Sequence, residues 1–262
     1  MSVKTPPGTP VAWYRYDDVT LADTDKVASW NDKSGNGYHV TASGSLRPTY
    51  GSQTLNGHPV LTFDGANRLA RATTPDISQP FTWLSVFRLG DDTDTGVSRV
   101  IAASTNDAGT NTILQGCRFE SSGTGQFAGW GSGSLELENG GPDENWHYGT
   151  SIFNGGSSEN IFDGATSSSG TGTSYNMNGL SIGDNVSGFT SSPWIGDIAE
   201  VTIYNSVLDF TSLTAWRRYL HYQYEITSAP PVGVVNKFIG YAVLFPQSAP
   251  TYRVSSVVIL NT

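Results

Sequence analysis

Turn-forming dipeptides interrupt this sequence at short intervals, and they constrain the fold more than any other feature. Asparagine or aspartate repeatedly precedes glycine, and both residues of such a pair accept the positive φ that tight hairpin turns require. Short runs rich in β-branched and aromatic residues lie between the pairs. Many short strands separated by such turns predict an antiparallel sandwich or barrel. The pairs are Asn36-Gly37, Asn56-Gly57, Asp64-Gly65, Asn139-Gly140, Asn154-Gly155, Asp163-Gly164 and Asn178-Gly179.

The apolar runs between these turns predict the strands themselves. The run from Phe81 to Phe87 is almost continuously apolar, as expected of a strand that is covered on both faces. In contrast, segments 121–134 and 154–174 are rich in Gly, Ser and Thr, and we expect long surface loops or hairpin tips there. The predicted strands are 60–63, 81–89, 99–103, 146–153 and 198–204.

The last of these strands has an alternating pattern that assigns its two faces. Ala199, Val201 and Ile203 form one alternating set, which we predict to face a dry core. Strict alternation also places Asp197 and Glu200 on opposite faces of the strand.

One amphipathic helix is expected after this strand. Asp209 has the side chain of a good N-cap, and apolar residues follow it with a period close to 3.6. Arg217 and Arg218 lie toward the C-terminal half, where positive charge suits the helix dipole. The helix should cover 209–224, and its apolar stripe consists of Phe210, Leu213, Trp216, Leu220 and Tyr224.

A Pro-Pro stretch after the helix marks a boundary in the chain. We expect an N-terminal arm at 1–10, a β-sandwich domain at 11–227 and a β-rich C-terminal extension at 228–262. The extension has few charges, so its β-like runs would be aggregation-prone if they were exposed. We therefore expect an assembly element that pairs with other copies of the chain, a trimer for example, or with another protein. Packing of these runs on their own sheet is the alternative.

Charge and composition exclude some classes of partner. The 262 residues include 23 acidic and 14 basic side chains, and the net charge of −9 argues against nucleic-acid binding. No apolar run approaches the length of a membrane-spanning helix. The single cysteine, Cys117, excludes an internal disulfide and is expected to be a small buried hydrophobe. The N-terminus lacks a signal-peptide pattern, so we expect synthesis in a host cytoplasm.

Several groups of residues occur in an order that is typical of a known family. In this order, residues 10–226 resemble the laminin G-like, concanavalin A-like jelly-roll domains of bacterial and phage surface proteins. The resemblance implies an all-β fold, a two-sheet antiparallel jelly-roll sandwich with one short C-terminal helix. The groups are Val27-Ala-Ser-Trp30-Asn-Asp32-Lys-Ser-Gly35-Asn-Gly37-Tyr-His39, Arg47-Pro48-Thr-Tyr50, Leu55–Gly65, Leu180–Gly183 and Trp194–Asn205.

This resemblance implies a non-catalytic structural protein of a phage virion, located in the minor tail or on the surface. Its partners would be other virion proteins, further copies of itself and glycans of the host surface, with no nucleic acid and no membrane. The same fold hosts lectins, glycosidases and scaffolds. A glycan-degrading enzyme is therefore the alternative. A bacterial surface adhesin module is a third interpretation, which the missing signal peptide disfavours.

Catalytic motifs are incomplete in this chain. Glycosidases of this fold use paired carboxylates on one strand face, one as acid and one as base or nucleophile. Glu136 and Glu138 have the spacing to share a face, but they lack the further acids of the Glu-x-Asp-x-Glu pattern. Ser181 has the spacing of a nucleophile elbow, but no helix follows it as that motif requires. We therefore expect no hydrolase activity.

Exposed aromatic rings are the candidates for glycan binding, because sugars stack on such rings. Trp130 lies in a flexible glycine-rich setting, which favours a sugar platform over a core position. Trp146 and His147 follow a turn and are the other two candidates. Packing of Trp130 beneath a loop is the alternative.

One acidic segment is a candidate for calcium. Asp91, Asp92 and Asp94 supply the hard oxygen ligands that Ca²⁺ prefers, although their spacing does not follow the helix-loop-helix calcium register. A solvated acidic hairpin is the alternative. The four histidines do not lie at metal-ligand spacing.

Overall fold

The computed structural model describes residues 5–19, 21, 24–90, 98–104, 113–119, 125–131, 134–139, 141–170, 175–184 and 193–226, with the backbone alone for 130–131, 134–139 and 165–170. Contacts divide the chain into two units, Met1–Pro231 and Val232–Thr262, and every described residue belongs to the first. The expected extension at 228–262 lies outside the described residues.

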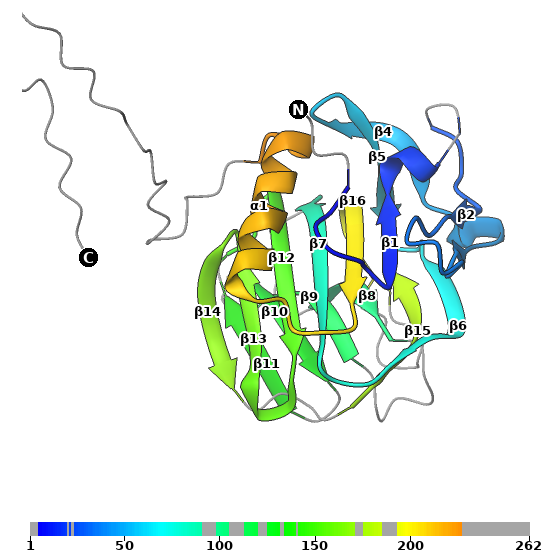
Figure 1. The fold of residues 1–262 in the computed structure, drawn as a ribbon. Coiled ribbons are helices and arrows are strands. Elements are labelled where there is room, and N and C mark those ends of the chain that lie inside the picture. Colours follow the sequence, from blue (N-terminus) through cyan, green and yellow to red (C-terminus); the bar gives the residue numbers. More distant parts are fainter. Residues whose placement is uncertain are drawn as a thin grey trace, which may run out of the picture. The chain divides into compact units, whose positions relative to one another are not determined.

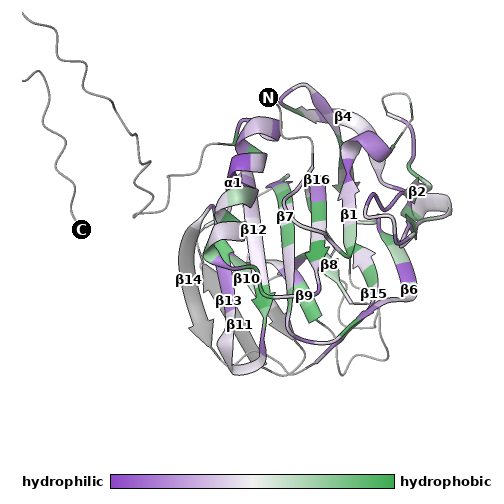
Figure 2. Ribbon diagram, in the orientation of Figure 1, coloured by the Kyte–Doolittle hydropathy of each residue, from purple (hydrophilic) through white to green (hydrophobic). Residues whose placement is uncertain are grey.

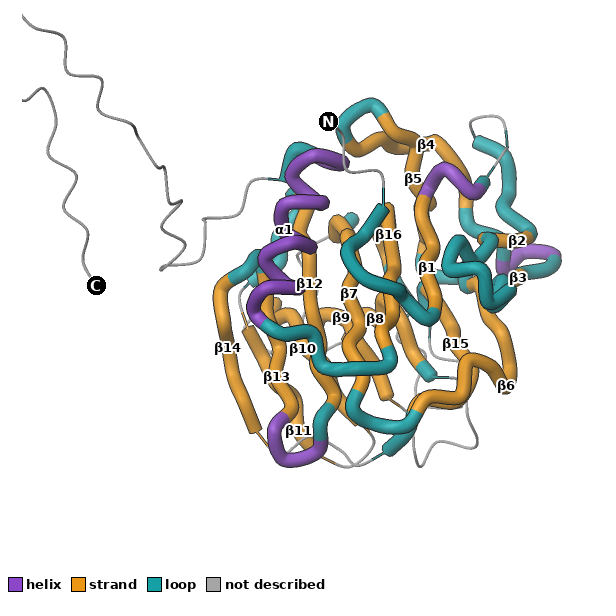
Figure 3. Tube along the Cα trace, viewed as in Figure 1, coloured by secondary structure: helices purple, strands orange, loops and turns teal. Residues whose placement is uncertain are grey.

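Two antiparallel sheets pack face to face (Figures 1 and 3), as the sequence predicts. The first sheet, which we call the helix-side sheet because the helix α1 (Phe210–Tyr224) lies against it, has the order β14-β13-β12-β7-β16-β5-β4. The strand β1 pairs with residues 200–203 of β16, beyond the part of β16 that pairs with β5. Its strands are β1 (Ala12–Arg15), β4 (Thr49–Leu55), β5 (His58–Asp64), β7 (Phe81–Leu89), β12 (Trp146–Phe153), β13 (Ser158–Phe162), β14 (Ala165–Gly170) and β16 (Ile195–Tyr204).

The second sheet closes the sandwich. Its order is β11-β10-β9-β8-β15-β6-β3-β2. Its strands are β2 (Ser29–Trp30), β3 (Val40–Thr41), β6 (Leu69–Ile77), β8 (Ser98–Ala103), β9 (Ile113–Phe119), β10 (Gly125–Gly131), β11 (Ser134–Asn139) and β15 (Met177–Ile182). Three short 3₁₀ turns join the strands, η1 (Tyr16–Asp18), η2 (Gly44–Leu46) and η3 (Gly155–Ser157).

The helix α1 (Phe210–Tyr224) lies over the outer face of the helix-side sheet (Figure 1). Asp209 caps it, because its side chain accepts a hydrogen bond of 2.7 Å from the Ser212 amide. Leu213, Trp216, Leu220 and Tyr224 are buried as predicted, but the prediction is wrong for Phe210, which is 59% exposed because it begins the helix outside its contact with the sheet. No helix in the described part of the chain could span a membrane.

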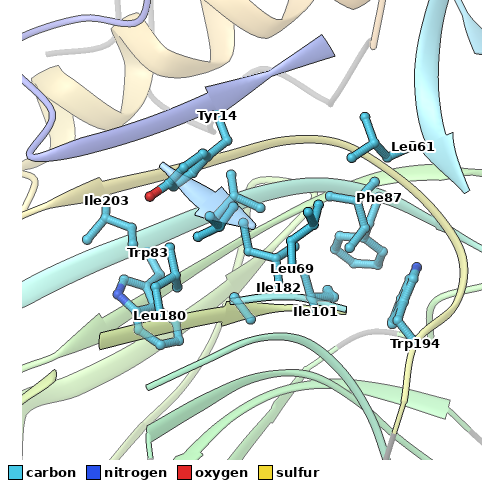
Figure 4. Packing of buried hydrophobic residues seen from close by; sticks show 14 of the residues in the cluster. Tyr14, Leu61, Leu69, Trp83, Phe87, Ile101, Leu180, Ile182, Trp194 and Ile203 are labelled. Atoms are coloured by element: carbon cyan, nitrogen blue, oxygen red, sulfur yellow. The ribbon is translucent and has the colours of Figure 1, made fainter. Parts of the chain in front are cut away.

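The core lies between the two sheets. Figure 4 shows its side chains pointing toward one another from strands of both layers. The run from Phe81 to Phe87 is buried at every position, because the second sheet covers one face and α1 the other. Figure 2 shows hydrophobic residues along central strands such as β7 and hydrophilic ones on β4 and α1. Cys117 is buried as expected, and Trp30 is fully buried in the same core.

The five predicted strands are confirmed, but the prediction for the glycine-rich segments is wrong in part. Segments 121–134 and 154–174 contain β10, β13 and β14 rather than loops alone. Gly129 of β10 shows the reason, because a Cβ there would lie 2.8 Å from both the Asn160 Oδ1 and the Ser151 Oγ of the facing sheet. Glycine in this strand therefore serves close packing between the sheets, as a buried strand can require.

Candidate functional site

Six side chains form a continuous row across the outer face of the helix-side sheet. We call this set, Lys26, Thr49, Thr62, Asp197, Arg88 and Trp146, the polar row. Each member stands directly opposite the next in the strand register, from the bridge at Lys26 through β4, β5, β16 and β7 to β12 (Figure 1). Five interstrand spacings of about 4.8 Å make the row about 24 Å long.

An ion pair occupies the centre of the row. The Asp197 Oδ2 accepts hydrogen bonds of 2.9 Å from the Arg88 Nε and 2.6 Å from the Arg88 Nη2. The Asp197 Oδ1 accepts a bond of 2.6 Å from the Thr62 hydroxyl. The Asp197 side chain is only 3% exposed, whereas that of Arg88 is 28% exposed. The carboxylate is thus satisfied from both sides, and one edge of the guanidinium reaches the surface.

Further groups extend the row at both sides of this pair. The Arg88 Nη2 also donates to the Gln53 Oε1 at 3.0 Å, and the Ser52 and Thr62 hydroxyls lie 2.6 Å apart. Ser52 and Gln53 are exposed. The Arg88 guanidinium lies over the Trp146 indole, 5.5 Å from the ring centroid, which is a cation–π contact. Lys26 donates to the Thr49 hydroxyl at 2.8 Å at the far end.

A glycine makes the centre of the row possible. Gly196 directly precedes Asp197 and has a φ of +136°, and a Cβ at this position would lie 2.2 Å from the Arg88 carbonyl oxygen. Any other residue would separate β16 from β7 here. The tight approach of the two strands sets Asp197 opposite Arg88.

A β-bulge changes the faces that alternation predicts for β16. The register opposite β7 shifts between Ile198 and Glu200, so Ala199 is an extra residue. Ala199 packs beneath α1, while Ile198, Val201 and Ile203 face the sandwich core. The core assignment is therefore wrong for Ala199 and right for Val201 and Ile203. Asp197 and Glu200 lie on the same outer face, against the prediction.

Glu200 is sealed beneath α1, where four neutral groups donate to its carboxylate. We call it and its donors, Trp13, Thr202, Tyr219 and Tyr224, the Glu200 cluster. The Trp13 indole donates at 2.8 Å and the Tyr224 hydroxyl at 2.5 Å, while Tyr219 reaches Oε1 at 3.0 Å and Oε2 at 2.8 Å. Thr202 donates at 3.2 Å.

The electrostatics of Glu200 follow from this burial. Its side chain is fully buried, and loss of hydration raises its pKa to about 7 although the tyrosine hydroxyls favour the charged form. The Arg15 Nη1 lies 3.3 Å from the Tyr219 hydroxyl, one group removed from the carboxylate. The cluster therefore ties β16, β1 and α1 together and offers no surface to a ligand.

The structure separates the two adjacent candidates Trp146 and His147. Trp146 belongs to the polar row, but the His147 ring lies on the inner side of the sheet, 4.8 Å from the Phe162 ring centroid. The His147 Nδ1 lies 2.7 Å from an Asp163 oxygen, and the Nε2 lies 2.9 Å from an Asp143 oxygen. Burial lowers the pKa of His147, but the two carboxylates outweigh it and the net pKa is raised.

The other predicted site residues are placed only in part. Trp130 lies in β10, and Glu136 and Glu138 lie in β11; the structure describes their backbone alone. The calcium candidates Asp91, Asp92 and Asp94 lie outside the described residues.

The described residues also contain no metal-binding group, and the serine motif has a structural explanation. Within these residues, no cluster of three or more His, Cys, Asp or Glu side chains could hold a metal ion. Ser181 is a buried residue of β15, and its hydroxyl donates to the Asp184 carbonyl at 2.6 Å.

Sequence reasoning missed Arg88, Thr62 and Gln53 as site residues. Arg88 had a signal, because it is the one charged residue in the apolar run of β7. A charge in such a run must face water or a partner, and here it faces both. Thr62 and Gln53 had no comparable signal, since their role comes from strands that are distant in sequence.

Comparison with known proteins supports the fold. No protein-family model and no curated protein sequence matches the chain. Domain 4 of an extracellular arabinanase from Geobacillus stearothermophilus, in complex with arabinotriose, is similar with a TM-score of 0.59 at 15% identity, over 79% of this chain and 98% of that domain. The chain is a two-sheet β-sandwich like that domain.

Two further solved structures share the sandwich. Trypanosoma rangeli sialidase in complex with sialic acid has a TM-score of 0.58 at 12% identity, over 86% of this chain and 34% of the sialidase. An arabinofuranosidase complexed with arabinofuranosyl-alpha-1,2-xylobiose has a TM-score of 0.56 at 12% identity, over 81% of this chain and 58% of that one. The chain thus spans only about a third of the sialidase. At these identities the likeness concerns the fold alone.

Proposed function

We propose that this chain is a non-catalytic glycan-binding module and that the polar row is its binding surface. The observation that carries the proposal is the unbroken series of contacts from Thr62 through Asp197 and Arg88 to Trp146. It combines hydroxyl, carboxylate and guanidinium groups with an indole ring on a partly exposed surface. Sugars present hydroxyl groups and apolar ring faces, and this combination is complementary to both.

The contacts within the row favour binding because they order the side chains before a ligand arrives. A side chain that is already fixed loses little entropy on binding, which is a large part of the cost of a polar contact. Exposed Ser52 and Gln53 add hydrogen-bonding groups beside the ordered centre. The row lies on a sheet face, so we expect weak binding at one site and useful avidity from several copies.

The ligands of similar proteins support a sugar as the ligand class. The arabinanase domain was solved with arabinotriose, the sialidase with sialic acid and the arabinofuranosidase with an arabinofuranosyl-xylobiose.

A non-catalytic role is supported by the state of the two carboxylates on this face. Most enzymes that hydrolyse a glycosidic bond use two carboxyl groups that both reach the substrate. Asp197 is held by Arg88 and Thr62, and Glu200 is fully buried under α1. Neither group is placed to protonate a leaving group or to attack a sugar.

The proposed location is the surface or minor tail of a phage virion, where several copies would contact a host glycan. This part of the proposal rests on the sequence resemblance alone. The few charges and β-like runs of residues 228–262 lead us to propose in addition that this segment mediates assembly. Light scattering of the full chain and of a chain that ends at Thr227 would test it: an oligomer that becomes a monomer on truncation agrees, and identical monomers contradict the assembly role.

Binding should depend on the row and not on exposed aromatics elsewhere. We expect Gln53→Ala and Trp146→Ala to lower affinity for a bound oligosaccharide at least fivefold in calorimetry, with unchanged circular dichroism. Phe210→Ala is the matched control, because Phe210 is an exposed aromatic at the start of α1. Trp130→Ala tests the remaining aromatic candidate. Loss of binding in Phe210→Ala or Trp130→Ala, with normal binding in the row variants, would contradict the proposed surface.

Catalysis is tested separately by the release of reducing sugar. We expect none from polysaccharides that the protein binds. Release that disappears in Glu136→Gln or Glu138→Gln would favour the glycan-degrading alternative, because these are the carboxylates with the spacing of a catalytic pair.

A further inference from the structure

We infer that Asp197 sets the charge class of the ligand and makes the polar row selective for uncharged glycans over sugar acids. The inference rests on the proposed glycan-binding function and adds a specificity-determining residue to it. Its basis is the position of the one cation at the centre of the row. Arg88 is the group to which a sugar carboxylate would bind, and the protein already supplies a carboxylate there.

The centre of the row carries balanced charge. The two Arg88 bonds to the Asp197 Oδ2 are in the range of charge-assisted hydrogen bonds. The other cation among the row residues is Lys26, which is four interstrand spacings from Arg88, or about 19 Å. A further exposed acid, Asp64, lies two residues after Thr62 on the same face of β5. A sugar carboxylate thus approaches a guanidinium that Asp197 already neutralises, on a face that carries a further negative charge.

Competition for Arg88 would be costly for an anionic ligand. Asp197 is almost fully buried, so a ligand that removed Arg88 would leave a buried carboxylate without its cation. Neutral hydroxyl groups need no such exchange. They can accept hydrogen bonds from the exposed edge of Arg88 and exchange bonds with Gln53 and Ser52 while the ion pair stays intact.

Asp197→Asn is the decisive variant, because it removes the negative charge and keeps the size of the side chain. Its Oδ1 can still accept the Thr62 bond, and Arg88 becomes a cation without a counter-ion. We expect affinity for trigalacturonate, a uronic-acid trimer, to rise about tenfold, since a charge-assisted hydrogen bond contributes about that much. The gain should shrink as salt increases, because it is electrostatic. Affinity for a neutral trimer such as arabinotriose should change less than threefold.

The controls separate this inference from the proposed function. Wild-type protein should bind neutral trimers at least tenfold more tightly than trigalacturonate. This measurement needs no variant, so it does not depend on whether a variant folds. Arg218→Ala, which removes an exposed cation of α1 outside the row, should leave both affinities unchanged. If wild-type protein binds trigalacturonate as well as neutral trimers, and Gln53→Ala abolishes this, the row binds glycans but the role of Asp197 is wrong. If Asp197→Asn folds without gaining anionic affinity, the inference is likewise overturned. If no glycan of either class binds, the proposed function fails together with it.

Discussion

Asp197 and Glu200 lie three residues apart on the same strand and the same face, yet their carboxylates have opposite kinds of partner, a cation for Asp197 and neutral donors for Glu200. Asp197 faces a cation at the edge of the solvent, and Arg88 neutralises it directly. Glu200 lies beneath a helix, and its closest partners are neutral donors. A bulge at Ala199 brings both onto one face, and the end of α1 separates a covered region from an open one.

The comparison shows that hydrogen bonds alone do not replace hydration for a buried charge. Glu200 has four donors, and its pKa still rises to about 7 because the whole side chain is removed from water. In the polar row, the Arg88 cation compensates Asp197 for its lost hydration, and Arg88 is exposed enough to contact a ligand as well. We therefore assign stability to the Glu200 cluster and recognition to the polar row.

The largest expected effect is the loss of stability in Glu200→Ala. Removal of the carboxylate leaves the buried donors of Trp13, Tyr219 and Tyr224 without an acceptor and opens a small cavity. Each unsatisfied buried group costs about 1–3 kcal/mol, so we expect a loss of about 3–5 kcal/mol in the free energy of unfolding. Urea denaturation measures it. A loss below about 1 kcal/mol would mean that the cluster does not hold α1 on the sheet.

The second effect is a decline in stability as pH rises. The pKa of Glu200 is raised from 4.5 in the unfolded chain to about 7 in the folded protein, so the folded state binds more protons between these values. Its contribution is fully present below pH 4.5 and is lost as pH rises through about 7. The decline should be on the order of 3 kcal/mol. Glu200→Gln, which cannot ionise, should flatten this part of the curve. An unchanged curve in that variant would exclude Glu200 as the cause.

The two regions also differ in how far the sequence could reveal them. The strands and the capped helix follow from local patterns, and the structure confirms them. The bulge does not, because Ala199 is small and apolar and fits either face. Val201 and Ile203 were assigned correctly because they lie beyond the shift. The polar row depends on the order of five strands and a bridge in one sheet, and no local pattern contains that order.

A smaller effect is expected from Asp197→Ala, and it sharpens the contrast with Glu200→Ala. Arg88 loses its carboxylate, but its side chain is 28% exposed and water can take over part of the interaction. We expect a loss of about 1–2 kcal/mol in the free energy of unfolding. Parallel urea titrations of the two alanine variants give the ranking directly. Equal losses would mean that exposure does not distinguish the two carboxylates.

The smallest effect should come from His147, whose pKa is raised by Asp163 and Asp143 against the effect of burial. A raised pKa of a base means that its stabilising contribution is present below its unfolded pKa of 6.5 and is lost as pH rises through the higher folded value. We expect less than about 1 kcal/mol, because the carboxylates of Asp163 and Asp143 are 36% and 51% exposed. Because the unfolded pKa of His147 is 6.5 and the folded pKa of Glu200 is about 7, the loss due to His147 begins at a pH where most of the decline due to Glu200 has already occurred. His147→Gln in the Glu200→Gln background isolates it, since the remaining slope above pH 6.5 should vanish. A slope that persists in the double variant would place the titrating group elsewhere in the chain.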